Sequence, residues 1–189
     1  MVPDKTEAYY YRGRSLAAKL DFDKAIADFA EVVKINPRHV AALVGIADCW
    51  FQKHDLNQAI HFYTQAIAVE PNAYAFAWRS AAYVQCQDFQ RGLSDADEAI
   101  RLAPHMPDAH ASRGHACMAM GNAREAIEDF SEAIRIVPRE ARYYSMRGLV
   151  YSQIAEHDRA MSDHEKAFHL LESCPCGSNS SFPPELSES

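Results

Sequence analysis

Long apolar runs are missing from this sequence of 189 residues. No stretch approaches the roughly 18 consecutive apolar residues that a membrane-spanning helix needs, so we expect no membrane partner. The first residues, MVPDKTEAYYYRGR, also lack the basic-then-apolar order of a secretory signal. Both absences favour a cytoplasmic location, with the nucleus as the alternative.

Basic side chains are in deficit, with 19 lysines and arginines against 26 acidic residues and a net charge of −7. Proteins that bind nucleic acid through phosphates usually present a basic face. A local basic patch can exist within an acidic total, but the balance argues against a nucleic-acid partner.

Cysteine is present as five residues, an odd number. Three of them, Cys49, Cys86 and Cys117, lie in apolar stretches, where a reduced thiol behaves as a small hydrophobe. This usage fits a reducing compartment. The remaining two form a lone C-x-C, with two histidines upstream that are five residues apart and so lie off one helical face; a structural zinc site needs four closely spaced ligands, and we expect no metal.

Catalytic motifs are also lacking. The sequence contains no H-E-x-x-H or G-x-S-x-G, and no glycine-rich phosphate loop that follows a strand. The nine histidines are scattered without a paired nucleophile. We therefore expect no enzymatic activity and no cofactor.

Prolines mark an internal repeat. Pro37, Pro71, Pro104 and Pro138 are 34, 33 and 34 residues apart, and each ends a similar run such as DKAIADFAEVVKINP or REAIEDFSEAIRIVP. A fifth copy, DRAMSDHEKAFHLLE, ends at Glu172 without the proline. Apolar residues in these runs recur at intervals of one, three and four residues, which predicts amphipathic helices.

An Arg-Gly pair marks an earlier segment of each unit, at Arg12-Gly13, Arg113-Gly114 and Arg147-Gly148. The third unit has Arg79-Ser80, and the second has Ile46-Ala47. The first position of this pair follows the proline by 9 residues after Pro37, Pro104 and Pro138, and by 8 residues after Pro71. The missing residue therefore falls in the turn between the second and third units.

This pattern resembles the tetratricopeptide repeat: 34 residues with a small residue at position 8, alanine at 20 and 27, an aromatic at 24 and proline at 32. Alanine at position 20 is found in four units and at position 27 in four units, and the first, second and fourth units carry the aromatic at position 24. The resemblance implies an all-α fold, a right-handed solenoid of five antiparallel helix pairs whose first helices line a concave groove.

The expected boundaries follow from the period. An array spans residues 1–172, with repeats at about 6–39, 40–73, 74–106, 107–140 and 141–172. Residues 173–189 are rich in serine and proline, and we expect a disordered tail there. The fifth unit departs most from the pattern, as terminal repeats often do.

The resemblance also implies a partner-binding groove on the first helices. The residues that fall on its lining positions are Tyr10, Tyr11, Arg14, Asp48, Phe51, Tyr74, Trp78, His115, Met118, Arg142 and Met146. Aromatic residues, methionine and arginine are what protein interfaces favour at their centres. The alternative is that several of these side chains only fill the packing between repeats.

Two narrower hypotheses can be weighed on the residues. Chaperone-binding members of the family hold an acidic tail with a clamp of Lys, Asn and Arg; here only Arg14 could serve, so we expect no such binding. The repeated arginines could bind an acidic segment, but the stronger interpretation is that they pair with carboxylates such as Asp28, Asp95 and Asp129.

The expected function is that of a non-catalytic scaffold or adaptor that holds a partner peptide or helix in the groove. The alternative is a structural subunit that self-associates, or docks into a complex, through its uncapped last repeat. RNA binding by a related 35-residue repeat is a third hypothesis, which the period and the charge disfavour.

Overall fold

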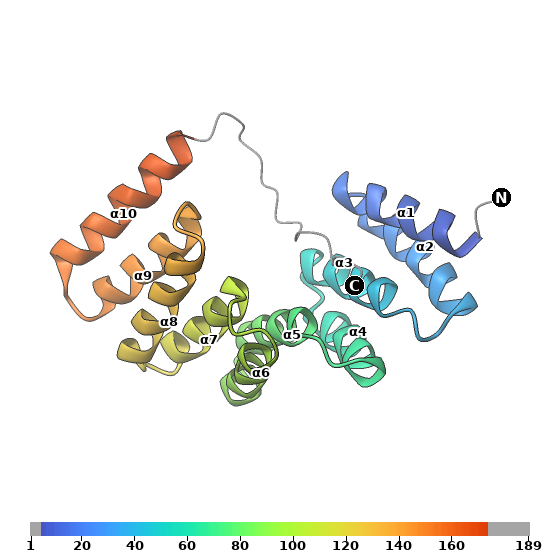
Figure 1. Ribbon diagram of the computed structural model, residues 1–189, viewed down its shortest axis with the longest axis horizontal. Helices are drawn as coiled ribbons and strands as arrows, with labels where there is room; N and C mark the ends of the chain where they lie inside the picture. Colours follow the sequence, from blue (N-terminus) through green and yellow to red (C-terminus); the bar gives the residue numbers. More distant parts are fainter. Residues whose placement is uncertain (1–4, 174–189) are drawn as a thin grey trace.

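The computed structural model describes residues 5–173, and this part of the chain folds entirely into helices joined by short turns (Figure 1). The expected all-α solenoid of helix pairs is confirmed. The helices are α1 (Lys5–Ala18), α2 (Phe22–Ile35), α3 (Val40–Gln52), α4 (Leu56–Val69), α5 (Ala73–Gln85), α6 (Phe89–Leu102), α7 (Pro107–Ala119), α8 (Ala123–Ile136), α9 (Ala141–Gln153) and α10 (His157–Glu172).

Five helix pairs stack into an open arch, with α1 and α2 at one end and α9 and α10 at the other (Figure 1). Each helix packs mainly against the helices before and after it in the chain, and α5 also packs closely against α7. In the middle of the arch, α4 and α6 lie on the outer side of α3 and α5. No described helix is long and apolar enough to cross a membrane.

The turn inside each pair ends its first helix with a residue in the left-handed region. This residue has a φ of 62° at Leu20, 60° at His54, 61° at Gln87, 81° at Gly121 and 61° at Ala155. The chain then reverses, and an Asp side chain caps the next helix in two pairs: Asp55 accepts a hydrogen bond from the amide of Gln58, and Asp88 from that of Arg91.

Prolines separate consecutive pairs, as the period predicts. The second helices of the first four pairs end two residues before each proline. Without a proline, α10 continues to Glu172 and is two residues longer than α8. The helix α5 begins at Ala73, one residue before the expected boundary at 74. The expected tail and its C-x-C lie outside the described residues, apart from Ser173.

Small residues let the two helices of a pair approach closely. Gly114 faces the ring of Phe130, and a Cβ at this glycine would lie 3.0 Å from the Cζ atom of that ring. Phe130 is fully buried, and so is Ala126 one turn earlier. Buried clusters of this kind follow one another along the array, so each repeat adds to the core of its neighbours.

A ladder of ion pairs joins the two helices of four repeats. Each arginine of the first helix donates two or three hydrogen bonds to an aspartate 16 residues later, with N–O distances from 2.6 to 3.1 Å; the pairs are Arg12 with Asp28, Arg79 with Asp95, Arg113 with Asp129 and Arg147 with Asp163. The expectation that these arginines pair with nearby carboxylates is confirmed. The second repeat has Ile46 and Phe62 at these two positions.

Candidate functional site

Four predicted groove residues meet where the first helices of the second and third repeats face each other. We call Asp48 and Phe51 of α3, together with Tyr74 and Trp78 of α5, the groove cluster. The rings of Phe51 and Trp78 pack edge to face with centroids 5.3 Å apart, and the Tyr74 ring lies 6.0 Å from that of Trp78. These distances suit favourable aromatic pairs, so the cluster forms a pre-organised apolar surface.

The helix spacing explains why long side chains line this part of the arch. Between α5 and α7 the backbones approach closely, and the Ser112 hydroxyl donates a hydrogen bond of 3.0 Å to the carbonyl of Ala77. Between α3 and α5 the helices meet mainly through the side chains of the groove cluster. The groove cluster therefore lies at a junction where fewer backbone contacts join the two first helices.

Asp48 supplies the carboxylate of the cluster. The hydroxyl of Tyr63, on α4, donates to its Oδ1 atom at 2.5 Å, and the hydroxyl of Tyr74 donates to its Oδ2 atom at 3.1 Å. Burial raises the pKa of Asp48 to about 7, against the opposing effect of the two hydrogen bonds. No cationic side chain forms an ion pair with this carboxylate within the described range.

Trp78 contributes a hydrogen-bond donor. Its Nε1 atom is buried and has no acceptor among the described residues. A buried donor without an acceptor costs about 1–3 kcal/mol, so a carbonyl that became its partner would recover part of this cost once neighbouring side chains moved to expose the atom.

Four other predicted residues gather between α7 and α9. Met118 and Met146 pack on the same hydrophobic cluster, which argues that they serve the packing between repeats. Arg142 donates a hydrogen bond of 2.5 Å to the Oδ1 atom of Asp108 in the preceding repeat. His115 is mostly shielded from solvent, and burial, followed by the charge of Arg142, lowers its pKa. A neutral imidazole is therefore favoured here.

The last three predicted residues lie on α1. The rings of Tyr10 and Tyr11 are 5.5 Å apart, and the guanidinium of Arg14 lies over the Tyr10 ring at 5.9 Å. Tyr10 packs against the core, whereas Tyr11 is 58% exposed. The eleven predicted residues thus form three groups along the array, and none of the described contacts links one group to another.

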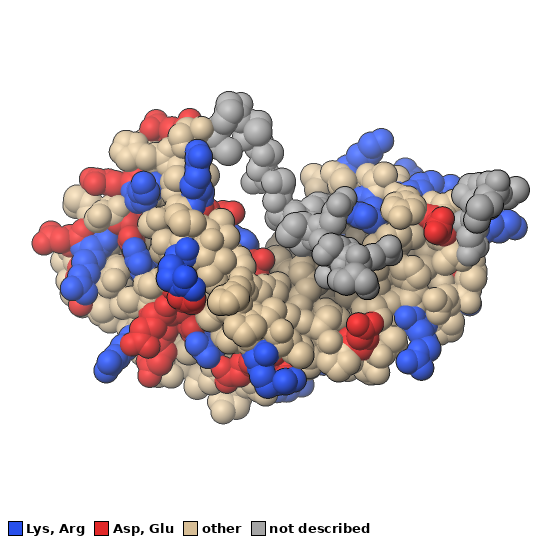
Figure 2. All heavy atoms as spheres, viewed as in Figure 1, with Lys and Arg blue, Asp and Glu red and all other residues tan. Residues whose placement is uncertain are grey.

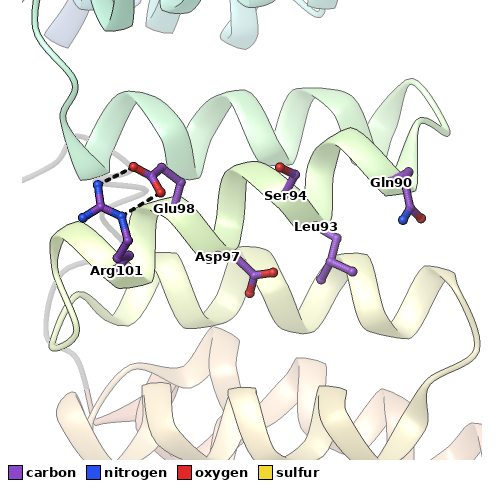
Figure 3. A pocket seen from close by; sticks show the side chains of 6 residues that line it. All are labelled: Gln90, Leu93, Ser94, Asp97, Glu98 and Arg101. Atoms are coloured by element: carbon purple, nitrogen blue, oxygen red, sulfur yellow. Dashed lines mark hydrogen bonds and ion pairs between the residues drawn. The ribbon is translucent and has the colours of Figure 1, made fainter.

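Charged side chains are unevenly distributed over the face of the molecule drawn in Figure 2. In Figure 2, blue and red side chains alternate over the half of the arch that carries the last repeats, and larger uncharged stretches lie over the first three. A shallow depression on the outer helix α6 is polar by comparison (Figure 3). All of its lining residues come from one exposed helix face: Gln90, Leu93, Ser94, Asp97, Glu98 and Arg101.

Tyr63 contacts the groove cluster but was not among the predicted groove residues. It belongs to a second helix, at the position where the first and fourth repeats carry Phe29 and Phe130. A tyrosine in place of phenylalanine brings a hydroxyl that needs a partner when it is buried. The presence of Asp48 in the same repeat is the sequence signal that could have revealed this bond.

Two tetratricopeptide repeat profiles match the chain, one over residues 16–81 and the other over residues 79–141. The chain belongs to the tetratricopeptide repeat family. The family supports a general role as a protein-interaction scaffold, and its members are typically non-catalytic.

Relatives of known name share part of this tetratricopeptide array. Mouse tetratricopeptide repeat protein 28 is 36% identical over 74 residues, which are 39% of this chain and 3% of that protein. Human serine/threonine-protein phosphatase 5 is 35% identical over 82 residues, which are 43% of this chain and 16% of that protein. The matches thus cover a small share of each relative's length, and the repeats alone are what is shared.

Solved structures show the same fold over most of the chain. A MamA protein is 27% identical, with a TM-score of 0.71 over 89% of this chain and 92% of the other. A thermophilic tetratricopeptide repeat protein of Thermus thermophilus is 20% identical with a TM-score of 0.79, over 89% of this chain and 92% of the other. Both confirm the helical repeat architecture.

Proposed function

We propose that this protein is a non-catalytic scaffold that holds a partner peptide or helix against the groove cluster. The observation that carries the proposal is the buried Nε1 donor of Trp78, which lies beside the Phe51 ring and has no acceptor within the described part of the chain. Stacked rings with one free donor suit a peptide backbone or a side chain that supplies both apolar surface and a carbonyl.

The carboxyl group of Asp48 gives the site a preference for a basic side chain. A lysine or arginine side chain has an apolar stem that can lie along the rings of Phe51 and Trp78 and a cation that can reach a carboxylate. The hydroxyls of Tyr63 and Tyr74 donate hydrogen bonds to this carboxyl group and hold it in place. We therefore propose that the partner segment presents a basic side chain flanked by apolar residues.

Compartment and cofactor are part of the same proposal. The described cysteines, Cys49, Cys86 and Cys117, are free thiols, which fits the cytoplasm, with the nucleus as the alternative. We propose no cofactor and no nucleic-acid partner, since the site offers aromatic rings and a carboxylate rather than a basic surface.

The test is a selection of binding peptides from a random library on the immobilised protein, followed by calorimetric titration of the enriched sequences. Trp78→Ala should weaken them about 30-fold, which corresponds to the roughly 2 kcal/mol of an interface hot spot. Asp48→Asn should weaken peptides that contain lysine and leave their methionine-substituted forms nearly unchanged. Circular dichroism should show that both variants keep the helical signal of the wild type.

A matched control comes from the outer helix α6. Gln90→Ala combined with Ser94→Ala changes two exposed residues of the depression in Figure 3 and should leave every affinity unchanged. Equal affinities for the wild type and for Trp78→Ala would contradict the proposal and place binding elsewhere on the protein.

A further inference from the structure

The stacking of repeats gives each first helix a face that the preceding repeat covers. In α3, α5, α7 and α9 this face carries two residues seven positions apart, all at most 2% exposed: Ala42 and Cys49, Ala75 and Ala82, Ala109 and Ala116, Tyr143 and Val150. The equivalent residues of α1 are Ala8 and Ser15, which are exposed, and Tyr11 lies between them at 58% exposed. Among residues 5–173, nothing covers this stacking face of α1.

The second helices have a matching face that the following repeat covers. In α8 it carries Ile127 and Ile134, which are partly buried and pack against the core that includes residues of α9. The equivalent residues of α10 are Met161 and Phe168, at 62% and 58% exposed. Large apolar side chains at this exposure on one helix face mark an interaction surface rather than a solvent face.

Polar contacts define how the two faces meet inside the array. The Nη1 atom of an arginine in each of the last three repeats contacts a side chain in the second helix of the repeat before it; the pairs are Arg79 with Thr64 at 2.8 Å, Arg113 with Asp97 at 3.2 Å and Arg147 with Ser131 at 2.9 Å. Where the arginine is replaced by Ile46, the residue at the facing position is Ala30. The two positions thus match in polarity at each of the four junctions.

The two open ends carry a complementary pair at these same positions. On α10 the facing position is Glu165, which is exposed and makes no ion pair within residues 5–173. On α1 the arginine is Arg12, whose side chain is 64% exposed and bonds Asp28 through Nε and Nη2, as its counterparts do with their own aspartates. The junction between repeats three and four has this same acid-to-arginine pairing, in Asp97 and Arg113.

We propose that the protein assembles head to tail with a second copy of itself, so that α10 of one copy packs on α1 of the next as one more repeat junction. Met161 and Phe168 lie on Ala8, Tyr11 and Ser15, and Glu165 pairs with Arg12. The interface joins two different faces, so growth continues until it closes or ends at an unoccupied face. The two ends lie far apart on the arch, which leaves both accessible in one molecule (Figure 1). This inference goes beyond the groove proposal and uses other residues.

Sedimentation velocity on the full chain tests the proposal. The wild type should show a mass that rises with concentration from the 21.2 kDa of one chain. Phe168→Asp and Tyr11→Asp each place a charge on one open face, and both change exposed side chains, so each variant should stay at the mass of one chain with an unchanged helical signal. An equimolar mixture of the two variants should form a dimer of twice this mass and nothing larger, because each copy retains one open face.

The ion pair has its own test. Glu165→Lys should weaken the wild-type association at least tenfold. Glu128→Lys makes the same charge change at an exposed position of α8, away from both open faces, and should weaken the association far less. Three outcomes would overturn the proposal: a wild type that keeps the mass of one chain at every concentration, a mixture of the two variants that does not dimerise, and a Tyr11→Asp protein that dimerises alone. The last outcome would show pairing of two α10 faces instead.

Discussion

The buried carboxyl group of Asp48 predicts that this residue's own contribution to folding stability falls as the pH rises. Asp48 has a pKa near 7 in the folded protein against an ordinary value of 3.8, so the folded state keeps a proton that the unfolded chain releases between these two values. The contribution of Asp48 to stability is therefore largest below about pH 4, falls through the window from about 4 to 7, and levels off above it. This is the reverse of the behaviour of a salt-bridged carboxylate.

The size of the effect follows from the difference in proton affinity. From 3.8 to about 7 is roughly a thousandfold, which corresponds to about 4 kcal/mol at most. Asp48 keeps some contact with solvent, so we expect about 2–4 kcal/mol. The groups that face it, the hydroxyls of Tyr63 on α4 and Tyr74 on α5, stay neutral throughout this window. The charge of Asp108, on α7, also raises the pKa of Tyr74.

Asp48→Asn isolates this contribution. An asparagine is neutral at every pH and can still accept the hydrogen bond from Tyr63, so the variant should become more stable than the wild type as the pH rises. Urea unfolding followed by circular dichroism at about pH 4.5 and about pH 8 measures the difference. His115, whose lowered pKa acts in the opposite direction, titrates in both proteins and cancels in that difference.

A second variant checks the hydrogen bonds. Tyr63→Phe removes a donor that favours the charged form, so it should raise the pKa of Asp48 further and extend the fall in stability to higher pH. If the difference between the wild type and Asp48→Asn were the same at both pH values, the argument from burial would be refuted.

Two further predictions concern the array. Arg79→Ala should cost about 3 kcal/mol in the free energy of unfolding because it leaves Asp95, 10% exposed, without its partner; Arg101→Ala, which removes an exposed pair with a glutamate, should cost far less in the same urea titration. Ala155→Gly should stabilise the protein by about 1 kcal/mol and Gly121→Ala should destabilise it by a similar amount, since both residues have a positive φ; a change of the opposite sign in thermal unfolding would contradict this.

The fold could be predicted from the sequence because each repeat restates the same physical requirements. Prolines such as Pro104 and small residues such as Gly114 recur at a fixed spacing, and five copies make the helix-pair pattern unambiguous. Local departures were also visible, since the missing proline in the fifth unit leads to the longer α10. Periodic patterns report what the repeats share.

The site could be predicted less well because it depends on what the repeats do not share. The groove positions included Asp48 and Trp78, but they gave no sign that the hydroxyl of Tyr63 would reach Asp48 from a second helix. Tyr11 occupies the position equivalent to Trp78, yet it lies at the end of the array, where no described helix precedes α1. The repeat position alone cannot distinguish Tyr11 from Trp78, because the exposure of each side chain depends on which helices lie beside it.

The nearest-neighbour packing of the helices also has a mechanical consequence. Since no described helix touches one on the far side of the arch, bending is resisted only at the successive junctions, and small rotations at each junction add along the array. The opening of the arch can therefore widen or narrow through small rotations at the junctions while the buried contacts within each repeat stay intact. A segment bound on the inner side would favour the curvature that fits it, so its thickness would change the distance between the two ends of the protein.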